Sequence, residues 1–276
     1  MENNMIRLIC GALLLITAST LSADEQMIPA NEYSLQVSRQ GQGERIVVFE
    51  AGFGTPGQVW QGVIGQLGAG FTAISYSRAG IGKSGGQGKV KTIAEHLQDL
   101  HLVIDSQAAN QPVLLVGHSY GGLLVTEYAR QHPERVQAIV LVDPATMTQR
   151  LAFKATAAER IAADDQKLLS MLPPAMAADY RALTTQLDAA APSTVALPDV
   201  PLMLLTSTRV ESEPFVFEET REGKAIWKQQ HTHLFAQFNR GQHQFFADAG
   251  HNIHREQPAA VAEAIETAAN WARAKP

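Results

Sequence analysis

The stretch "LLVGHSYGGLLVTEYA", residues 114–129, carries the clearest indication of the fold. The apolar run before Gly117 has the length of a buried strand, and the residues after Ser119 have helical spacing. Gly117, Ser119 and Gly121 form the pattern G-x-S-x-G, in which small residues relieve crowding on both sides of a tight turn. The segment therefore predicts a strand that turns sharply into a helix, with a serine hydroxyl projecting from the corner.

Apolar runs of strand length alternate with helical segments along most of the chain. The clearest helical segment is 92–107, where Thr92 and Glu95 form a capping box, and another runs from about Gln257 to Ala274. The alternation predicts an α/β fold with a mostly parallel, doubly wound sheet. We expect an antiparallel edge strand at 33–40. The other predicted strands are 45–50, 71–76, 112–117, 136–142, 201–206 and 243–248.

One region interrupts this alternation. Residues from about 145 to 198 contain no convincing strand and are rich in Ala, Leu and Met. They predict two or three helices inserted before the strand at 201–206, as a cap over the carboxyl edge of the sheet. The apolar side chains of this cap form either a pocket wall or the cap's own small core. With no linker or repeat, we expect one domain over 24–276.

The first 23 residues have the composition of a secretory leader. A short apolar segment follows Arg7, and small and polar residues lead up to Ala23, after which cleavage is expected, with Ser22 as the alternative site. The apolar part is shorter than the roughly 20 residues of a membrane span. We therefore expect a signal peptide, a periplasmic or secreted protein and no stable membrane span in the mature chain. Cys10 is the only cysteine, so the mature chain would hold no disulfide.

Four motifs together resemble those of the α/β-hydrolase superfamily, and the resemblance covers nearly all of the predicted mature chain. "GHSYGG" resembles the nucleophile elbow, and "DAGHNIHREQP" resembles the segment that carries the catalytic histidine. "EAGFGTPGQVW" is similar to the oxyanion loop, with Ala51 where His is more usual. "YSRAGIGKS" is similar to the D-R-x-G-x-G-x-S segment, with Ser77 replacing Asp. The resemblance implies a serine hydrolase that needs no cofactor and no metal.

The glycines of the oxyanion loop also match a dinucleotide-binding pattern. Gly52, Gly54 and Gly57 have the spacing G-x-G-x-x-G, but such a site needs an acidic residue about 20 positions on, where this chain has Ser77. We therefore expect no nucleotide. The resemblance instead implies an oxyanion hole formed by the backbone amides of Phe53 and Tyr120.

The resemblance implies a catalytic triad of serine, histidine and an acid. His251 is the candidate base for Ser119, since it follows the last strand and lies C-terminal to the serine. The acid is either Asp143, at the end of strand 136–142, or an acid after strand 201–206, where Glu211 and Glu213 lie. We favour Asp143, because it terminates its strand directly. Among the other histidines, His118 is expected to point away from the site and His254 to be structural.

These residues predict a serine hydrolase that cleaves a small carboxylic ester through an acyl-enzyme. Lactonase, amidase, aminopeptidase and haloperoxidase-like activities would use the same residues and stay open, as does a non-catalytic ligand-binding module of this fold. The formal net charge of −5 and the lack of a Lys and Arg cluster argue against a nucleic-acid partner. The partner we expect is a small ester-like molecule; the oligomeric state is not predicted.

The leader hypothesis makes a direct prediction about the mature protein. Mass spectrometry of the protein from its native host should find an N-terminus near Asp24, in a fraction outside the cytoplasm. An intact Met1 in the cytoplasmic fraction would contradict the leader assignment.

Overall fold

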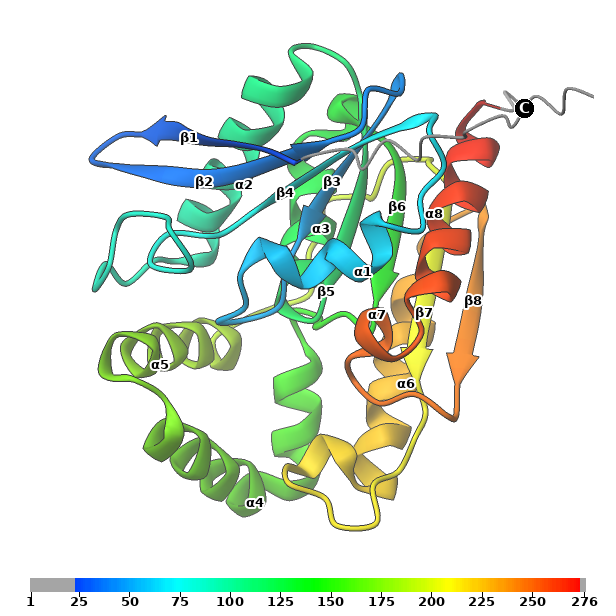
Figure 1. Cartoon of the computed structure of the whole chain (residues 1–276). Coiled ribbons are helices and arrows are strands. Elements are labelled where there is room, and N and C mark those ends of the chain that lie inside the picture. Colours follow the sequence, from blue (N-terminus) through cyan, green and yellow to red (C-terminus); the bar gives the residue numbers. More distant parts are fainter. Residues whose placement is uncertain (1–22, 274–276) are drawn as a thin grey trace, which may run out of the picture.

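A computed structural model describes residues 23–273 of the chain. The predicted leader therefore lies outside the described residues except for its last residue, and its cleavage stays a prediction. The described part forms one eight-stranded sheet with the order β1-β2-β4-β3-β5-β6-β7-β8 (Figure 1). The strands are β1 (Asp24–Ala30), β2 (Tyr33–Gln40), β3 (Arg45–Glu50), β4 (Phe71–Tyr76), β5 (Val113–His118), β6 (Val136–Val142), β7 (Leu202–Ser207) and β8 (Gly241–Phe246).

The sheet confirms the predicted α/β class and corrects one detail of it. From β4 to β8 all neighbours pair in parallel, and the central strands are buried on both faces, as their unbroken apolar runs predict. β2 is antiparallel, as expected, but it is not the edge strand, because β1 pairs along its outer side. Polar and exposed residues dominate β1, so its sequence lacks the apolar signal of a strand.

Helices cover both faces of the sheet and enclose two apolar cores (Figure 1). The capping box predicted for α2 is present: the Thr92 hydroxyl accepts from the Glu95 amide, and the Glu95 carboxylate accepts from the Thr92 amide. One face carries α2 (Ile93–Ala108), α3 (Tyr120–Gln131) and α6 (Arg221–Phe235), and the other carries η1 (Gly57–Trp60), α1 (Gln61–Ile64), α7 (Ile253–Glu256) and α8 (Pro258–Arg273). Two short 3₁₀ turns, η2 (Pro133–Arg135) and η3 (Phe217–Glu219), precede β6 and α6.

The predicted cap consists of two helices between β6 and β7, α4 (Gln149–Met171) and α5 (Pro174–Asp188). Figure 1 shows them beyond the ends toward which the arrows of β6 and β7 point. α4 is bent at Ala157, whose backbone leaves the helical region. Phe153 and Ile161 of α4 pack with Phe217 and Trp227, so the cap is joined to η3 and α6 by a small apolar core of its own. In the part of the chain that the structure describes, no helix combines the length and apolarity needed to cross a membrane.

Candidate active site

Ser119 occupies a strained corner between β5 and α3. Its φ of 52° lies in the left-handed region, which only a closely determined turn imposes on a serine. The flanking glycines are required by space: a Cβ on Gly117 would lie 2.6 Å from the Gly121 carbonyl oxygen, and one on Gly121 would lie 2.3 Å from that of Glu50. The G-x-S-x-G pattern thus lets β5 turn directly into α3 and leaves the Ser119 side chain partly accessible.

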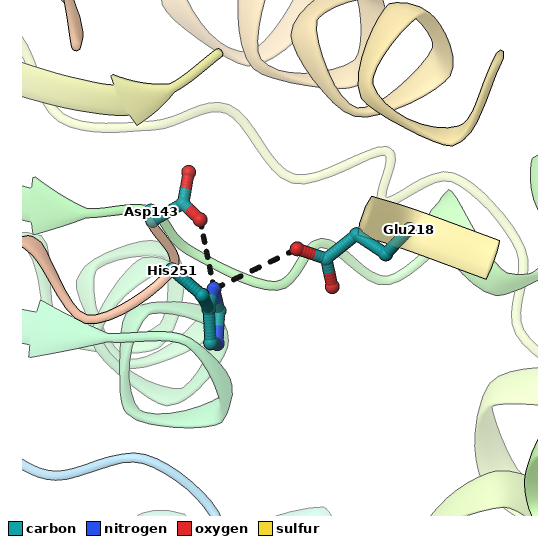
Figure 2. A group of neighbouring side chains, drawn as sticks. All are labelled: Asp143, Glu218 and His251. Carbon is teal, nitrogen blue, oxygen red and sulfur yellow. Dashed lines mark hydrogen bonds and ion pairs between the residues drawn. The ribbon is translucent and has the colours of Figure 1, made fainter. Parts of the chain in front are cut away.

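Asp143 and His251 meet at the same edge of the sheet. Asp143 directly follows β6 with a φ of 44°, and its side chain is fully buried. Its Oδ1 accepts from the Ser207 amide at 2.8 Å and from Trp227 Nε1 at 2.7 Å. Its Oδ2 lies 2.7 Å from His251 Nδ1 (Figure 2). Because the carboxylate occupies Nδ1, it holds the imidazole in the tautomer whose Nε2 can accept a proton.

The charges around this pair oppose the effect of burial. Burial alone would raise the pKa of Asp143, but the hydrogen bond from His251 and the charge of its ring hold that pKa below its usual value. Burial likewise opposes protonation of His251, yet the nearby Glu218 carboxylate and the Asp143 carboxylate raise the pKa of His251 above its usual value. The site therefore stabilises an imidazolium paired with carboxylate, the charge state that a general base reaches after taking a proton.

The alternative acids lie elsewhere. The Glu211 carboxylate accepts from Arg209 Nε at 2.7 Å, and Arg209 also binds Glu256. Glu213 is exposed. Neither contacts His251, so of the three acids considered from the sequence the structure brings only Asp143 to the histidine.

Two residues near His251 were not anticipated. We expected His118 to point away from the site, but it lies beside His251. Its ring lies 4.7 Å from that of His251, and its Nε2 lies 2.9 Å from the His251 carbonyl oxygen. Glu218, in η3, places Oε1 3.7 Å from His251 Nδ1 (Figure 2). His254 is buried against His118 and Trp60, which agrees with a structural role.

The loop after β3 reaches the serine from the other side. A Cβ on Gly52 would lie 2.9 Å from His118 Nδ1 and 3.5 Å from Ser119 Cβ, so a larger residue would crowd the elbow. Arg78 donates to the carbonyl oxygens of Ala51 and Gly52, each at 2.5 Å. In a trans peptide the N–H points opposite to the preceding C=O, so the contact with Gly52 fixes the direction of the Phe53 N–H.

The guanidinium that holds this loop is itself buried. Arg78 pairs with Glu50 at 2.5 Å, and both side chains are less than 5% exposed. The Tyr76 hydroxyl donates to the other oxygen of Glu50. Because every partner lies on β3, β4 or their loops, the oxyanion loop is braced by groups that the fold already fixes. Ser77 takes a related role, since its hydroxyl accepts from the Gly57 amide at 3.1 Å.

A cavity of about 220 Å³ separates Ser119 from the cap. Each charged residue in its wall is paired within the protein. Arg150 binds Asp165 and Asp188, Asp164 binds Arg160, and Glu218 binds Lys224. The apolar and aromatic wall residues are Phe53, Tyr120, Ala145, Phe153, Ile161, Leu168, Tyr180, Leu183, Leu187, Val216 and Phe217. The expected apolar pocket wall is therefore present, and Phe153 and Ile161 belong both to it and to the cap's own core.

Asp143, Glu218 and His251 also satisfy a spacing at which a metal ion could be held, since one ligand atom of each lies within 4.8 Å of the others. Their hydrogen bonds and ion pairs to one another and to Lys224 argue against a metal site. The ligand atoms of Asp143 and His251 are bonded to each other, and the ammonium of Lys224 lies 3.1 Å from Glu218 Oε1. A cation at this place would break the hydrogen bond between His251 and Asp143 and would be repelled by the ammonium of Lys224.

Between described residues, the structure has no hydrogen bond from the Ser119 hydroxyl to His251. The geometry thus joins the candidate base to its acid and brings Ser119 to the same cavity wall as Tyr120 and Phe53. Hydrogen bonds of this kind are often long before substrate is bound.

The chain belongs to the alpha/beta hydrolase family, whose model matches residues 47–264. It is 26% identical over 227 residues to the uncharacterized protein YqjL of Bacillus subtilis (strain 168), covering 82% of this chain and 84% of that protein. It is 39% identical over 102 residues to a pimeloyl-[acyl-carrier protein] methyl ester esterase of Klebsiella pneumoniae (strain 342), a match that spans 37% of each chain.

Solved structures share the fold. An epoxide hydrolase from Vigna radiata superposes with a TM-score of 0.66 at 18% identity, covering 89% of this chain and 97% of that one. The thioesterase domain from the curacin biosynthetic pathway superposes with a TM-score of 0.57 at 20% identity, covering 89% of this chain and 99% of that one. These two structures show the fold alone, and the reaction depends on the residues of this site.

The hydrogen bonds of Asp143 make Asp143→Asn an informative variant. The Asn oxygen must accept from Ser207 and Trp227, which turns the amide NH₂ toward His251 Nδ1 and selects the wrong tautomer. We expect kcat on an activated ester to fall roughly 10³–10⁴-fold, with little change for Glu211→Gln. Steady-state kinetics with thermal melting as the folding control would measure both effects. The opposite ranking of the two variants would place the acid after β7.

Proposed function

We propose that the protein is a serine hydrolase that cleaves a small carboxylic ester through an acyl-enzyme intermediate. The observation that carries the proposal is the hydrogen bond between His251 Nδ1 and the buried Asp143 carboxylate. This bond leaves Nε2 as the proton acceptor, and Ser119 lies in the wall of the cavity under the cap. We also propose, from the composition of residues 1–23 alone, that the protein is periplasmic or secreted.

In the first step Ser119 Oγ bonds to the ester carbonyl carbon, the carbonyl π electrons move to its oxygen, and His251 Nε2 takes the hydroxyl proton. The amides of Phe53 and Tyr120 stabilise the oxyanion by roughly 3 kcal/mol per donor. The tetrahedral intermediate then collapses: the bond between the former carbonyl carbon and the alcohol oxygen breaks, and the alcohol leaves with the proton from His251. Water repeats the sequence on the acyl-enzyme and releases the acid. Every step uses residues of this chain and no cofactor.

The cavity supports an uncharged, largely apolar acyl group of modest size. Its volume of about 220 Å³ suits a short chain or a single ring, and its aromatic and aliphatic wall can remove such a group from water. The paired charges offer no free cation to an acyl group that ends in a carboxylate. An anionic acyl group would therefore lose its hydration without gaining a partner.

Other reactions of the family are weighed against this proposal. The Klebsiella relative is named for an ester substrate, which supports ester chemistry, whereas the epoxide hydrolase resembles this chain at the level of the fold. A lactone or amide would use the same residues. A ligand-binding module needs no activated serine, so covalent reactivity separates it from a hydrolase.

A small fluorophosphonate tests the proposal directly. Its phosphorus accepts the attack of an activated serine, so we expect one adduct per chain, on Ser119, by intact-mass and peptide analysis. Labelling should vanish in Ser119→Ala, fall at least 100-fold in rate in His251→Ala, and persist in EDTA. Folded protein that forms no adduct on Ser119 would leave the ligand-binding alternative.

A further inference from the structure

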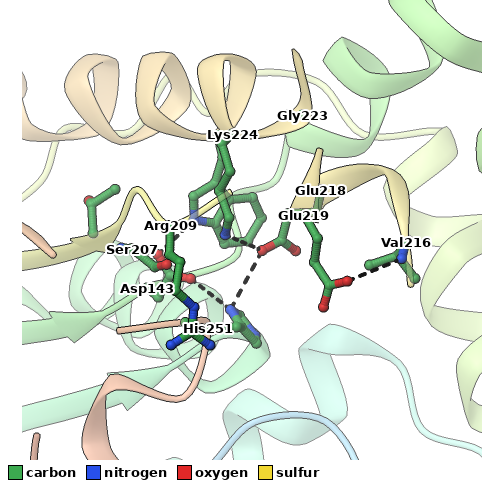
Figure 3. A network of polar contacts seen from close by, with 12 residues as sticks. Asp143, Ser207, Arg209, Val216, Glu218, Glu219, Gly223, Lys224 and His251 are labelled. Carbon is green, nitrogen blue, oxygen red and sulfur yellow. Dashed lines mark hydrogen bonds and ion pairs between the residues drawn. The ribbon is translucent and has the colours of Figure 1, made fainter. Parts of the chain in front are cut away.

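The second carboxylate beside His251 does not hold the turn in which it lies. In the turn η3, the carboxylate that stabilises the backbone is that of Glu219. Its Oε2 accepts from the Phe215 amide at 2.6 Å and from the Val216 amide at 3.4 Å. Among the residues that the structure describes, no backbone amide donates to the Glu218 carboxylate. Its Oε1 instead receives the ammonium of Lys224 at 3.1 Å and lies 3.7 Å from His251 Nδ1 (Figure 3). The turn thus uses one glutamate to hold its shape and presents the other to the base.

Lys224 is an unusual partner for such a carboxylate, because its side chain is only 5% exposed. It projects from the first turn of α6 toward the site, and its charge acts on both Glu218 and Asp143. A buried ammonium is costly unless it is paired, so Lys224 and Glu218 hold each other in place. The result is a row of alternating charges, Lys224, Glu218 and the imidazole of His251 (Figure 3).

The groups that face His251 from the remaining elements do not duplicate this effect. Asp143, from β6, is the hydrogen-bonded acid. His118, from β5, and His254, from α7, are buried, and burial holds the pKa of each well below its usual value, which disfavours a positive charge on either ring. Arg209 follows β7 and is more exposed to solvent, and its charge is already paired with Glu211 and Glu256. Glu218 and Lys224 are therefore the additional charges that can tune the base.

We propose that Glu218 is a positioning residue that favours the imidazolium form of His251 through space, and that Lys224 limits the strength of this effect. At 3.7 Å the contact is too long for a hydrogen bond, so the interaction is that of a fixed charge. It grows when His251 takes the proton of Ser119, since only then does the ring carry a positive charge. The inference rests on the proposed function for its catalytic meaning, while the charge interaction itself exists in the resting protein.

The test is an NMR titration of His251, with its resonances assigned by their loss in His251→Asn. Glu218→Gln removes the negative charge, so the pKa of His251 should fall by about one pH unit. Lys224→Gln removes the opposing positive charge and should raise it. Glu219→Gln removes the same charge from the same turn as Glu218→Gln, but its carboxylate faces backbone amides, so it should leave the pKa close to that of the wild type.

Kinetics supply the second readout. The base must be neutral to act, so kcat/KM falls as the pH drops through the pKa of His251. The acidic limb should therefore move to lower pH in Glu218→Gln and to higher pH in Lys224→Gln, and the plateau of Glu218→Gln should fall about tenfold. A purely structural role for Glu218 would lower the plateau without moving the limb.

The outcomes separate the two proposals. A wild-type enzyme that hydrolyses esters, with variants whose His251 titrates as in the wild type, would overturn this inference and leave the proposed function standing. Opposite shifts in the two variants of a protein without hydrolase activity would support the charge interaction and count against the proposed function. Shifts in the same direction for Glu218→Gln and Lys224→Gln would also overturn the inference.

Discussion

The buried carboxylate of Asp143 is the constraint on which the site depends. A charge without solvent exposure is tolerated only when it is fully hydrogen-bonded, and Asp143 has partners from β7, α6 and the loop before α7. These partners come together because β6 and β7 are parallel neighbours whose carboxyl ends lie at one edge. Removing one partner of a buried charge pair typically costs roughly 3–5 kcal/mol, so stability and orientation of the base are linked.

The same edge carries the other parts of the proposed reaction centre. β5 delivers Ser119, and β3 delivers the loop with Phe53, whose peptide direction Arg78 fixes. The cap closes the far side: a Cβ on Gly54 would lie 2.8 Å from Met176 Sδ, and the ring of Phe53 meets that of Tyr180. The cap and the loop after β3 are therefore in direct contact.

The sequence predicts those parts whose local pattern carries the information. The elbow around Ser119 is visible because its two glycines stand at a fixed spacing from the serine, although the atom that crowds Gly121 belongs to Glu50 of β3. The buried strands are visible as apolar runs. β1 is not visible in the sequence, since most of its residues are polar or exposed and its pairing with β2, rather than an apolar run, stabilises it. Glu218 and Arg78 were also missed. Arg78 stands in a segment that the sequence singles out, but its contacts, like that of Glu218, join residues far apart in the chain. They span 26–28 positions for Arg78 and 33 for Glu218, which a local pattern does not reveal.

The proposed reaction requires Ser119 to carry an acyl group during turnover, with His251 and Asp143 serving the proton transfers. Rapid acid quenching during hydrolysis of a slowly deacylating activated ester, followed by intact-mass and peptide analysis, tests this most directly. We expect a mass gain equal to one acyl group, located on Ser119 and absent in Ser119→Ala. Product formation without any acyl adduct on Ser119 under these conditions, or an adduct on another residue that turns over at the steady-state rate, would contradict it.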